Sequence, residues 1–519
     1  MSNADMPGTG ARDASGGRPG SPNPRGAVPI VAFLRRREGA LEVPTRLVVL
    51  LFVAISVVAL TLSIMLTPPG QVPDAGMQFD RAVEVSQGSL IGLVRDGNSG
   101  DFLPKGVVTF EMAFAPIPTH PAAKVTRSEL READRSVWGR AQQFVIFGGT
   151  TEYPPFAYLP GALAVWLARI FSSRVIVAYY MLECFNAIVF VALMGWALTL
   201  FRGIATSLLA AVALLPMTIA LAGSPSTDGI IIGLAAVFAG VVYRELADDP
   251  PHLTGRAEIV VDRRRGLAGW VPALSLPEWG AVCALSVAVL AKPAYFPLVL
   301  AIGAVQARQH DLLRYVQRVV PVAALMGAVL AAWYLLGARF QGAYAVAGPG
   351  VSPVAQIRFI LTHPVRIAHV AEATLNSQSV FYWHSFVGIL GWLDTPLESW
   401  LYLSILVAFG VLLVIRLVSG NIDWSALLCC AGAGILASAL VFITLYVDWT
   451  PVGSLAVRGV QGRYFLPVAP VIIAALGVDR ARVAWATVWW RVSAAAWLAM
   501  AWLAVGGASA ALLGRYWLT

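Results

Sequence analysis

Charged residues are scarce in this sequence of 519 residues. Only 13% of the residues are Asp, Glu, Lys or Arg, whereas 58% are hydrophobic. Soluble globular domains usually contain about 25% charged residues, so this composition excludes a soluble enzyme with a single buried core. Long apolar runs recur from Leu47 to Leu513, and they predict an all-α polytopic membrane protein.

Cysteine is also rare. The four cysteines, Cys184, Cys283, Cys429 and Cys430, all lie in apolar runs, which excludes a disulfide framework outside the membrane. No cluster of Cys and His has the spacing of a zinc site, and no Walker motif, dinucleotide fingerprint or nucleophile elbow occurs. ATP-driven transport by this chain alone is therefore not expected.

The net charge of +8 does not indicate nucleic acid as a partner. The basic residues fall between apolar runs, where retention on the cytoplasmic side and attraction to anionic lipid headgroups account for them. We expect contact with membrane lipids and no contact with nucleic acid.

A polytopic membrane domain is predicted for residues 46–513. About 11 transmembrane helices (11–13) and an N-terminus in the cytoplasm place every short basic loop on the cytoplasmic side. The eleven runs are 47–66, 175–200, 204–222, 227–245, 278–291, 293–306, 317–337, 398–418, 426–447, 463–478 and 492–513. A further run, 157–171, is interrupted by Pro160 and is predicted to be re-entrant or interfacial. The runs on either side of Lys292 are short, and a buried hairpin is the alternative there.

The polar segments between and before the apolar runs are assigned to one side of the membrane or the other. Residues 1–45 are rich in Gly, Pro, Ser and Arg, which predicts a disordered cytoplasmic tail. Residues 67–155 and 338–397 are predicted to form the first and second large extracytoplasmic loops. Within the first loop, Met77–Gln87 and Arg127–Phe147 are amphipathic and are predicted to be helices along the membrane surface. The extracytoplasmic face is therefore where chemistry or binding is expected.

Two acidic residues lie next to predicted membrane boundaries on that face. Asp74 follows a proline-rich exit from the first run, and a carboxylate there suits a general base or a metal ligand. Its alternative role is to cap a helix that starts near Ala75. Asp228 ends the string Ser224–Asp228, where capping of the next helix is again the alternative to a role in a polar cavity.

Basic residues on the same face are candidates for anion binding. Lys292 lies between two apolar runs, and an ionisable residue at membrane depth indicates function unless it snorkels to the interface. Arg463 opens a run in the string Gly459–Pro467, where arginine and the amides of a helix N-terminus favour phosphate or another anion. Tyr464 and the upstream Arg458 join these candidates, with an interfacial anchor as the alternative.

Taken together, these strings resemble the bacterial family of predicted membrane proteins designated domain of unknown function 2142. The resemblance extends from about Leu47 to Leu513. The most specific string that shows it is Gln461–Pro467. The other matching residues, in chain order, are Pro73 and Asp74, Phe79, Arg81 and Ala82, Gln87 and Gly88, Leu103 and Pro104, Leu215–Met217, Ser224–Asp228 and Ala291–Pro293.

That family is similar to the C-type glycosyltransferase superfamily, in which a helix bundle transfers sugar from a polyprenyl-phosphate carrier to an acceptor outside the cytoplasmic membrane. The resemblance implies a multi-pass protein of the bacterial cytoplasmic (inner) membrane. It implies a catalytic acid at Asp74 and basic groups for the lipid phosphate, for which Arg463 and Lys292 are our candidates. The expected partners are a polyprenyl-phosphate-linked sugar and a glycan or lipid acceptor.

The sequence departs from the family pattern after the first run. The usual acidic pair and the following histidine fall on Asp74, Ala75 and Gln78, so only the first acid remains. The sequence therefore does not identify a cofactor. A divalent cation is the candidate, and Asp80 or Glu84 could then take the place of the lost ligands.

The sequence thus predicts a membrane glycosyltransferase of cell-envelope glycan assembly. In this hypothesis Asp74 deprotonates the acceptor, and Arg463 and Lys292 stabilise the leaving phosphate. A transporter or flippase of lipid-linked intermediates is one rival, since short interrupted runs fit discontinuous transport helices. A noncatalytic scaffold of an envelope-polysaccharide complex is the other, favoured by Ala75 and Gln78.

Overall fold

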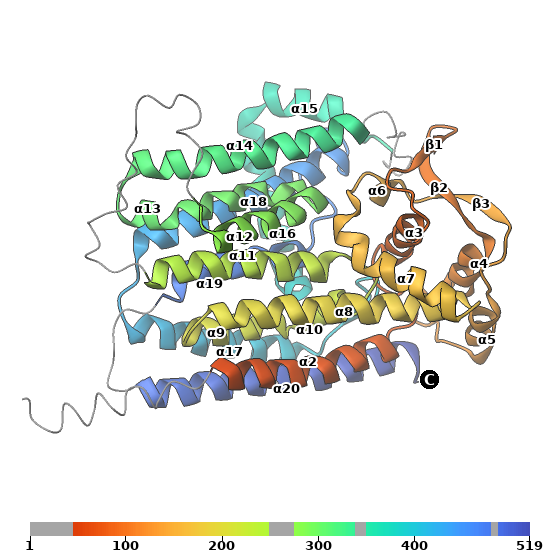
Figure 1. The fold of residues 1–519 in the computed structure, drawn as a ribbon, viewed down its shortest axis with the longest axis horizontal. Coiled ribbons are helices and arrows are strands. Elements are labelled where there is room, and N and C mark those ends of the chain that lie inside the picture. Colours follow the sequence, from red (N-terminus) through yellow and green to blue (C-terminus); the bar gives the residue numbers. More distant parts are fainter. Residues whose placement is uncertain (1–44, 249–273, 338–348, 479–485, 519) are drawn as a thin grey trace, which may run out of the picture. The chain divides into compact units, whose positions relative to one another are not determined.

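The computed structural model describes residues 45–248, 274–337, 349–478 and 486–518 (Figure 1). The predicted cytoplasmic tail lies outside the described residues, apart from Thr45, at which the first helix begins. The described part of the chain is mostly helical, with two small antiparallel sheets.

Among the described residues, seven helices are long and apolar enough to cross a membrane. They are α2 (Thr45–Leu66), α8 (Val175–Leu200), α11 (Asp228–Asp248), α14 (Leu312–Gly337), α17 (Ser399–Ser419), α18 (Trp424–Asp448) and α20 (Ala486–Tyr516). An eighth candidate is the pair α9 (Ile204–Ala213) and α10 (Pro216–Ala222), which is bent by 62°. The bend precedes Pro216, because proline cannot donate the next hydrogen bond of the helix.

Length and composition do not establish the predicted number of eleven crossings, because three of the expected runs are short or irregular. They correspond to α12 (Leu276–Ala291), to η3 (Pro293–Gly303) with α13 (Ala304–Arg308), and to η5 (Gly462–Phe465) with α19 (Ala469–Leu476). Lys292 ends α12 in an extended conformation, as expected for a residue before proline. All three segments pack against longer helices, which shields their irregular backbone.

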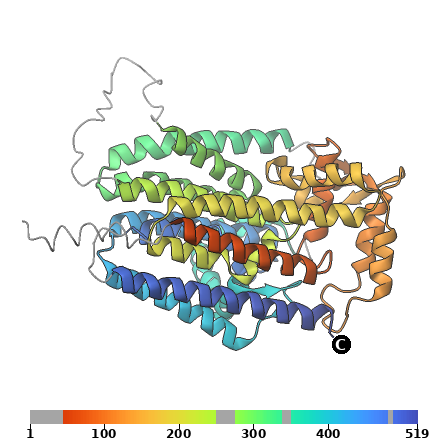
Figure 2. The same cartoon turned by 60° about the horizontal axis from the view of Figure 1, so that its bottom comes forward.

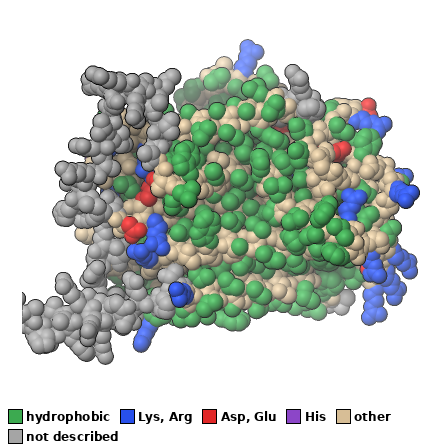
Figure 3. Space-filling model, viewed as in Figure 1, with side chains coloured by type: hydrophobic (Ala, Val, Ile, Leu, Met, Phe, Trp, Pro, Cys, Tyr) green, Lys and Arg blue, Asp and Glu red, His purple; other side chains and the backbone are tan. Residues whose placement is uncertain are grey.

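The apolar helices lie side by side, and the segment from residue 67 to 174 gathers at one end of them, here called the loop end (Figures 1 and 2). Figure 3 shows hydrophobic side chains over the middle of one face and most of the visible Lys or Arg side chains toward the two ends. The exposed apolar side chains include Leu50, Ile188, Leu403, Leu428 and Trp502 on candidate spans. This distribution fits a polytopic protein whose middle contacts lipid.

The segment at the loop end contains more than surface helices. Its elements are α3 (Ala75–Ser86), β1 (Leu93–Arg95), β2 (Asn98–Pro104), α4 (Lys105–Phe114), α5 (Arg127–Arg135), β3 (Gln142–Ile146), α6 (Gly148–Thr151), η1 (Pro155–Tyr158) and α7 (Leu159–Phe171). The three strands form an antiparallel sheet in the order β1-β2-β3.

Two predictions for this segment need correction. The helix predicted over Met77–Gln87 forms as α3, but most of its residues are buried in the protein instead of lying on the membrane surface. The helix predicted over Arg127–Phe147 was wrong beyond Arg135, because residues 142–146 form β3. Phe144 pairs with Phe102 of β2, and their ring centroids lie 5.6 Å apart, so cross-strand packing outweighs the local helical pattern.

The short run 157–171 is built as η1 and α7, which pack against α3 and α8. Before η1, Thr150 Oγ1 donates to Met77 O over 2.9 Å, and after α7, Trp138 N donates to Ser173 O over 3.0 Å. Both ends of the run are therefore tied to the segment 67–174, and the prediction that the run is re-entrant or interfacial stays a prediction.

The second large loop also reaches the loop end. Residues 338–348 are outside the described part, and the remainder forms α15 (Pro353–Thr362), α16 (Pro364–Val387), β4 (Ile389–Leu390) and β5 (Thr395–Pro396). Trp392 Nε1 donates to Gly70 O over 2.7 Å, which joins the second loop to the exit of α2. The C-terminal end meets the same exit, where Trp517 Nε1 donates to Leu66 O over 2.8 Å.

Candidate functional site

Four segments that are distant in sequence converge at the loop end. They contribute Asp74 after α2, Asp228 at the start of α11, Lys292 at the end of α12, and Arg463 with Tyr464 in η5. Arg463 Nη2 donates to Asp74 Oδ2 over 3.2 Å, and Lys292 Nζ donates to Asp228 Oδ1. Two ion pairs therefore lie in one cluster, which we call the paired-charge site.

Asp74 precedes α3 at the capping position but does not cap it with its side chain. Its backbone is left-handed, with a φ of 66°, a conformation that costs most residues about 1 kcal/mol or more. The side chain is 45% exposed, while the Arg463 side chain that it pairs with is only 4% exposed. The capping alternative is thus not realised, and the carboxylate is held at the edge of the buried cluster.

Arg463 is held by the close approach of η5 to α16. Gly462 N donates to Ser385 Oγ over 2.7 Å, and a Cβ atom on Gly462 would lie only 2.0 Å from Tyr382 O. Glycine is therefore required at this position. The Arg463 Nε–H is buried and has no acceptor among the described residues. An unused buried donor on a cation is costly unless a ligand accepts from it.

The ring of Tyr464 lies against both cations of the site. Lys292 Nζ is 5.1 Å and Arg463 Cζ is 5.3 Å from the centroid of its ring, both within the range of cation–π attraction. The Tyr464 carbonyl accepts from the hydroxyl of Tyr295 over 2.9 Å. Sequence reasoning missed Tyr295, although its position three residues after Lys292 placed it near the site.

Asp228 is the first residue of α11, and its carboxylate is directed to Lys292. Its backbone N–H donates to Ser226 Oγ over 3.1 Å, so Ser226 supplies the local hydrogen bond at this helix start. The Lys292 side chain is only 24% exposed, so it does not extend into solvent as the snorkelling alternative would require. Each residue therefore neutralises the other in a partly buried place.

Arg458 is not brought into the paired-charge site. Its backbone N–H donates to Thr450 Oγ1 over 3.0 Å, and the residue is exposed. None of the contacts that join the site's described residues involves its side chain.

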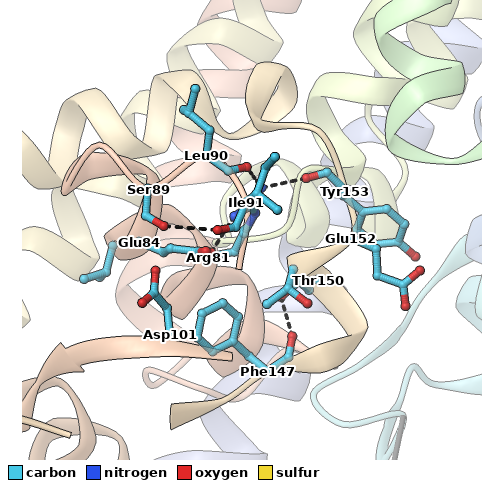
Figure 4. Close-up of polar contacts among 12 residues, drawn as sticks. Arg81, Glu84, Ser89, Leu90, Ile91, Asp101, Phe147, Thr150, Glu152 and Tyr153 are labelled. Atoms are coloured by element: carbon cyan, nitrogen blue, oxygen red, sulfur yellow. Dashed lines mark hydrogen bonds and ion pairs between the residues drawn. The ribbon is translucent and has the colours of Figure 1, made fainter. Parts of the chain in front are cut away.

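A second polar network fixes the helix that follows Asp74. Figure 4 shows Arg81 of α3 surrounded by Glu84 and by the carbonyl oxygens of Leu90 and Tyr153. Arg81 Nη1 donates to Glu84 Oε2 over 2.5 Å, and Nη2 donates to Leu90 O and Tyr153 O over 2.9 and 2.8 Å. Burial raises the pKa of Glu84 to about 7, although Arg81 acts in the opposite direction. Both side chains are fully buried. Through the bonds to Leu90 O and Tyr153 O, the network ties α3 to the segments that follow it and that precede α7.

The acidic residues near α3 do not form a cation site. Burial raises the pKa of Asp80 and of Glu111, with the charge of Glu111 adding to the effect on Asp80. Among the described residues, no three His, Cys, Asp or Glu side chains are placed to hold a metal ion. Ala75 has no ligand atom, and Gln78 is buried with an unpartnered Oε1. The donor set therefore does not fit a divalent cation at Asp74.

A match to a family profile agrees with the family resemblance in the sequence. The profile of the family described as Predicted membrane protein (DUF2142) matches residues 57–262 and 272–472. No curated protein matches the chain. The crystal structure of ArnT from Cupriavidus metallidurans bound to undecaprenyl phosphate is similar with a TM-score of 0.36 and 14% identity, covering 90% of this chain and 76% of that chain. Because the family match covers most of the sequence, the chain belongs to the DUF2142 family of predicted membrane proteins.

Proposed function

We propose that this member of the DUF2142 family is a C-type glycosyltransferase-like enzyme of cell-envelope glycan assembly. It would transfer a sugar from a polyprenyl-phosphate carrier to a glycan or lipid acceptor at the extracytoplasmic face of the inner membrane. The observation that carries the proposal concerns the buried Arg463. One of its N–H groups donates to the half-exposed Asp74, and its Nε–H has no acceptor among the described residues. The family resemblance supplies the reaction class.

The basic side chains would receive the phosphate of the carrier. A phosphate oxygen can accept from the unused Nε–H of Arg463 and compete with Asp74 for the neighbouring Nη2. Lys292, which also lies against the Tyr464 ring, would add a second positive charge. Charge that develops on the departing phosphate is stabilised best by donors that are already fixed in a buried site.

Asp74 would act as the general base. When the phosphate takes over Arg463, the carboxylate is released from its partner and can accept the proton of an acceptor hydroxyl. The hydroxyl oxygen forms a bond to the anomeric carbon as the bond from that carbon to the phosphate oxygen breaks. The polyprenyl phosphate leaves with the electron pair, and the anomeric configuration is inverted, as the resemblance implies. No step is assigned to a metal ion, because the residues present do not fit one.

The test is native mass spectrometry of the purified protein with a polyprenyl phosphate. Arg463→Gln should weaken binding at least about tenfold, the effect of losing roughly 1.4 kcal/mol. Arg458→Gln is the matched control, since this exposed arginine lies five positions away and outside the site. If wild-type protein retains polyprenyl phosphate no better than phosphatidylglycerol, or if both variants lose it equally, the proposal is wrong.

A transporter of lipid-linked intermediates is the rival that one observation favours. The bent pair α9 and α10 and the irregular η3 resemble the interrupted helices of transporters. Asp74→Asn separates the two functions, because it should abolish sugar transfer but leave lipid translocation in vesicles unchanged.

A further inference from the structure

A groove of about 680 Å³ opens where α15 ends and α16 begins. Its basic lining residues are His363, Arg366 and His369, and its apolar lining includes Val365 and Leu455. None of the described lining residues is acidic. The groove therefore combines positive or neutral polar groups with an apolar wall.

The polar side of the groove is arranged for an anion. It lies at the N-terminal end of α16, a helix of 24 residues whose dipole is positive there. His363 stacks on Phe359 with a centroid distance of 4.7 Å, and its Nδ1 is 2.8 Å from Thr362 Oγ1. Since the Thr362 hydroxyl donates to Arg358 O, it accepts from His363 Nδ1. The other ring nitrogen, Nε2, donates to an anion when the ring is protonated.

The apolar side suits acyl chains. Val354, Leu361 and Val365 are 81%, 75% and 73% exposed, among the most exposed large hydrophobic side chains of the described chain. Leu361 and Val365 flank the corner of two helices that follow the candidate span α14 in sequence, and Val354 lies at the other end of α15. Helices that combine exposed apolar side chains with basic residues are typical of the membrane–water interface.

The groove is separate from the paired-charge site. The other end of α16 holds η5, where Ser385 Oγ accepts from Gly462 N. A helix rises about 1.5 Å per residue, so the stretch from Arg366 to Ser385 places the two locations roughly 28 Å apart.

We propose that the groove at the corner of α15 and α16 binds the phosphodiester headgroup of an anionic membrane phospholipid. Arg366 and the two histidines contact the phosphate, and the acyl chains cover the exposed apolar side chains nearby. This binding is independent of the proposed transferase function, and it fixes the second large loop against the membrane.

The experiment measures binding of dihexanoyl phosphatidylglycerol by thermophoresis, with full-length protein in an uncharged detergent. Dihexanoyl phosphatidylcholine, which has the same chains but no net charge, and inorganic phosphate are the comparison probes. Arg366→Gln and, separately, His369→Gln are compared with Arg358→Gln, an exposed arginine on α15 that does not line the groove.

We expect phosphatidylglycerol to bind at least tenfold more tightly than either comparison probe. Arg366→Gln should weaken its binding about tenfold and His369→Gln several-fold, whereas Arg358→Gln and Asp74→Asn leave it unchanged. Equal affinity for phosphatidylcholine would show apolar adsorption only, and equal affinity for inorganic phosphate would show a free-anion site. Either result, or an equal loss in Arg358→Gln, overturns the proposal.

Discussion

Asp74 and Arg463 are 389 positions apart in the chain, yet Arg463 Nη2 lies 3.2 Å from Asp74 Oδ2. The pair joins the exit of the first candidate span to the segment that precedes α19. One partner is half-exposed and the other is buried, so a ligand can reach the carboxylate while the guanidinium stays fixed. This asymmetry is what a site needs when one group transfers a proton and the other holds an anion.

Replacing Asp74 by Asn should abolish transfer without unfolding the protein. Asparagine has nearly the same shape and tolerates the left-handed backbone at this position, but it cannot accept a proton as a base. We expect the rate to fall by a factor of about 10² to 10⁴. A transfer assay combined with a thermal melt checks this, and a melting temperature that falls together with activity would point to a structural role instead.

The ion pair between Lys292 and Asp228 should be energetically coupled. Both side chains are partly buried, so each single variant, Lys292→Gln or Asp228→Asn, leaves an unpaired charge. The double variant should be less destabilised than the sum of the single variants by about 1–3 kcal/mol. Denaturant unfolding of the four proteins gives this coupling energy, and strict additivity would show that the pair does not matter for stability.

Arg81→Lys should destabilise the segment around α3. Lysine keeps the charge but cannot donate to Glu84, Leu90 and Tyr153 from a planar fork, so we expect a loss of roughly 2–3 kcal/mol. Arg95→Lys, whose side chain is 59% exposed, is the control and should have little effect. Hydrogen exchange would locate the effect, and unchanged protection of α3 would contradict this role.

Glu111→Gln should flatten the dependence of stability on pH. Burial raises the pKa of Glu111 from 4.5 to about 7, so the folded state holds the proton more tightly than the unfolded state. Its stabilising contribution is therefore complete below pH 4.5 and is lost as the pH rises through about 7. The wild-type protein should lose roughly 3 kcal/mol from this group by pH 8.

Thermal melts between pH 4.5 and 8.5 test this effect. Relative to wild type, Glu111→Gln should gain stability at the alkaline end, because glutamine has no charge to bury. Glu132→Gln, at an exposed position of α5, is the control and should keep the wild-type profile. An unchanged slope in Glu111→Gln would mean that Glu111 ionises in water-filled surroundings.

Local pattern was a good guide where burial and periodicity agree. Of the eleven predicted runs, seven form long apolar helices and an eighth, 204–222, forms the bent pair. The prediction failed at residues 142–146, where pairing with β2 decides between strand and helix. That pairing depends on a partner some 40 residues away, which local periodicity does not reveal.

By itself, the sequence determined the class of protein and the end of the bundle at which polar residues gather. Apolar run length, prolines and the positions of charges act locally, so they can be read along the chain. Only the tertiary structure decided that Asp74 pairs with Arg463 instead of capping α3, that Lys292 pairs with Asp228, and that Arg458 stands apart. Such choices are made by packing between distant segments, because a buried charge takes the partner that the fold brings within hydrogen-bond distance.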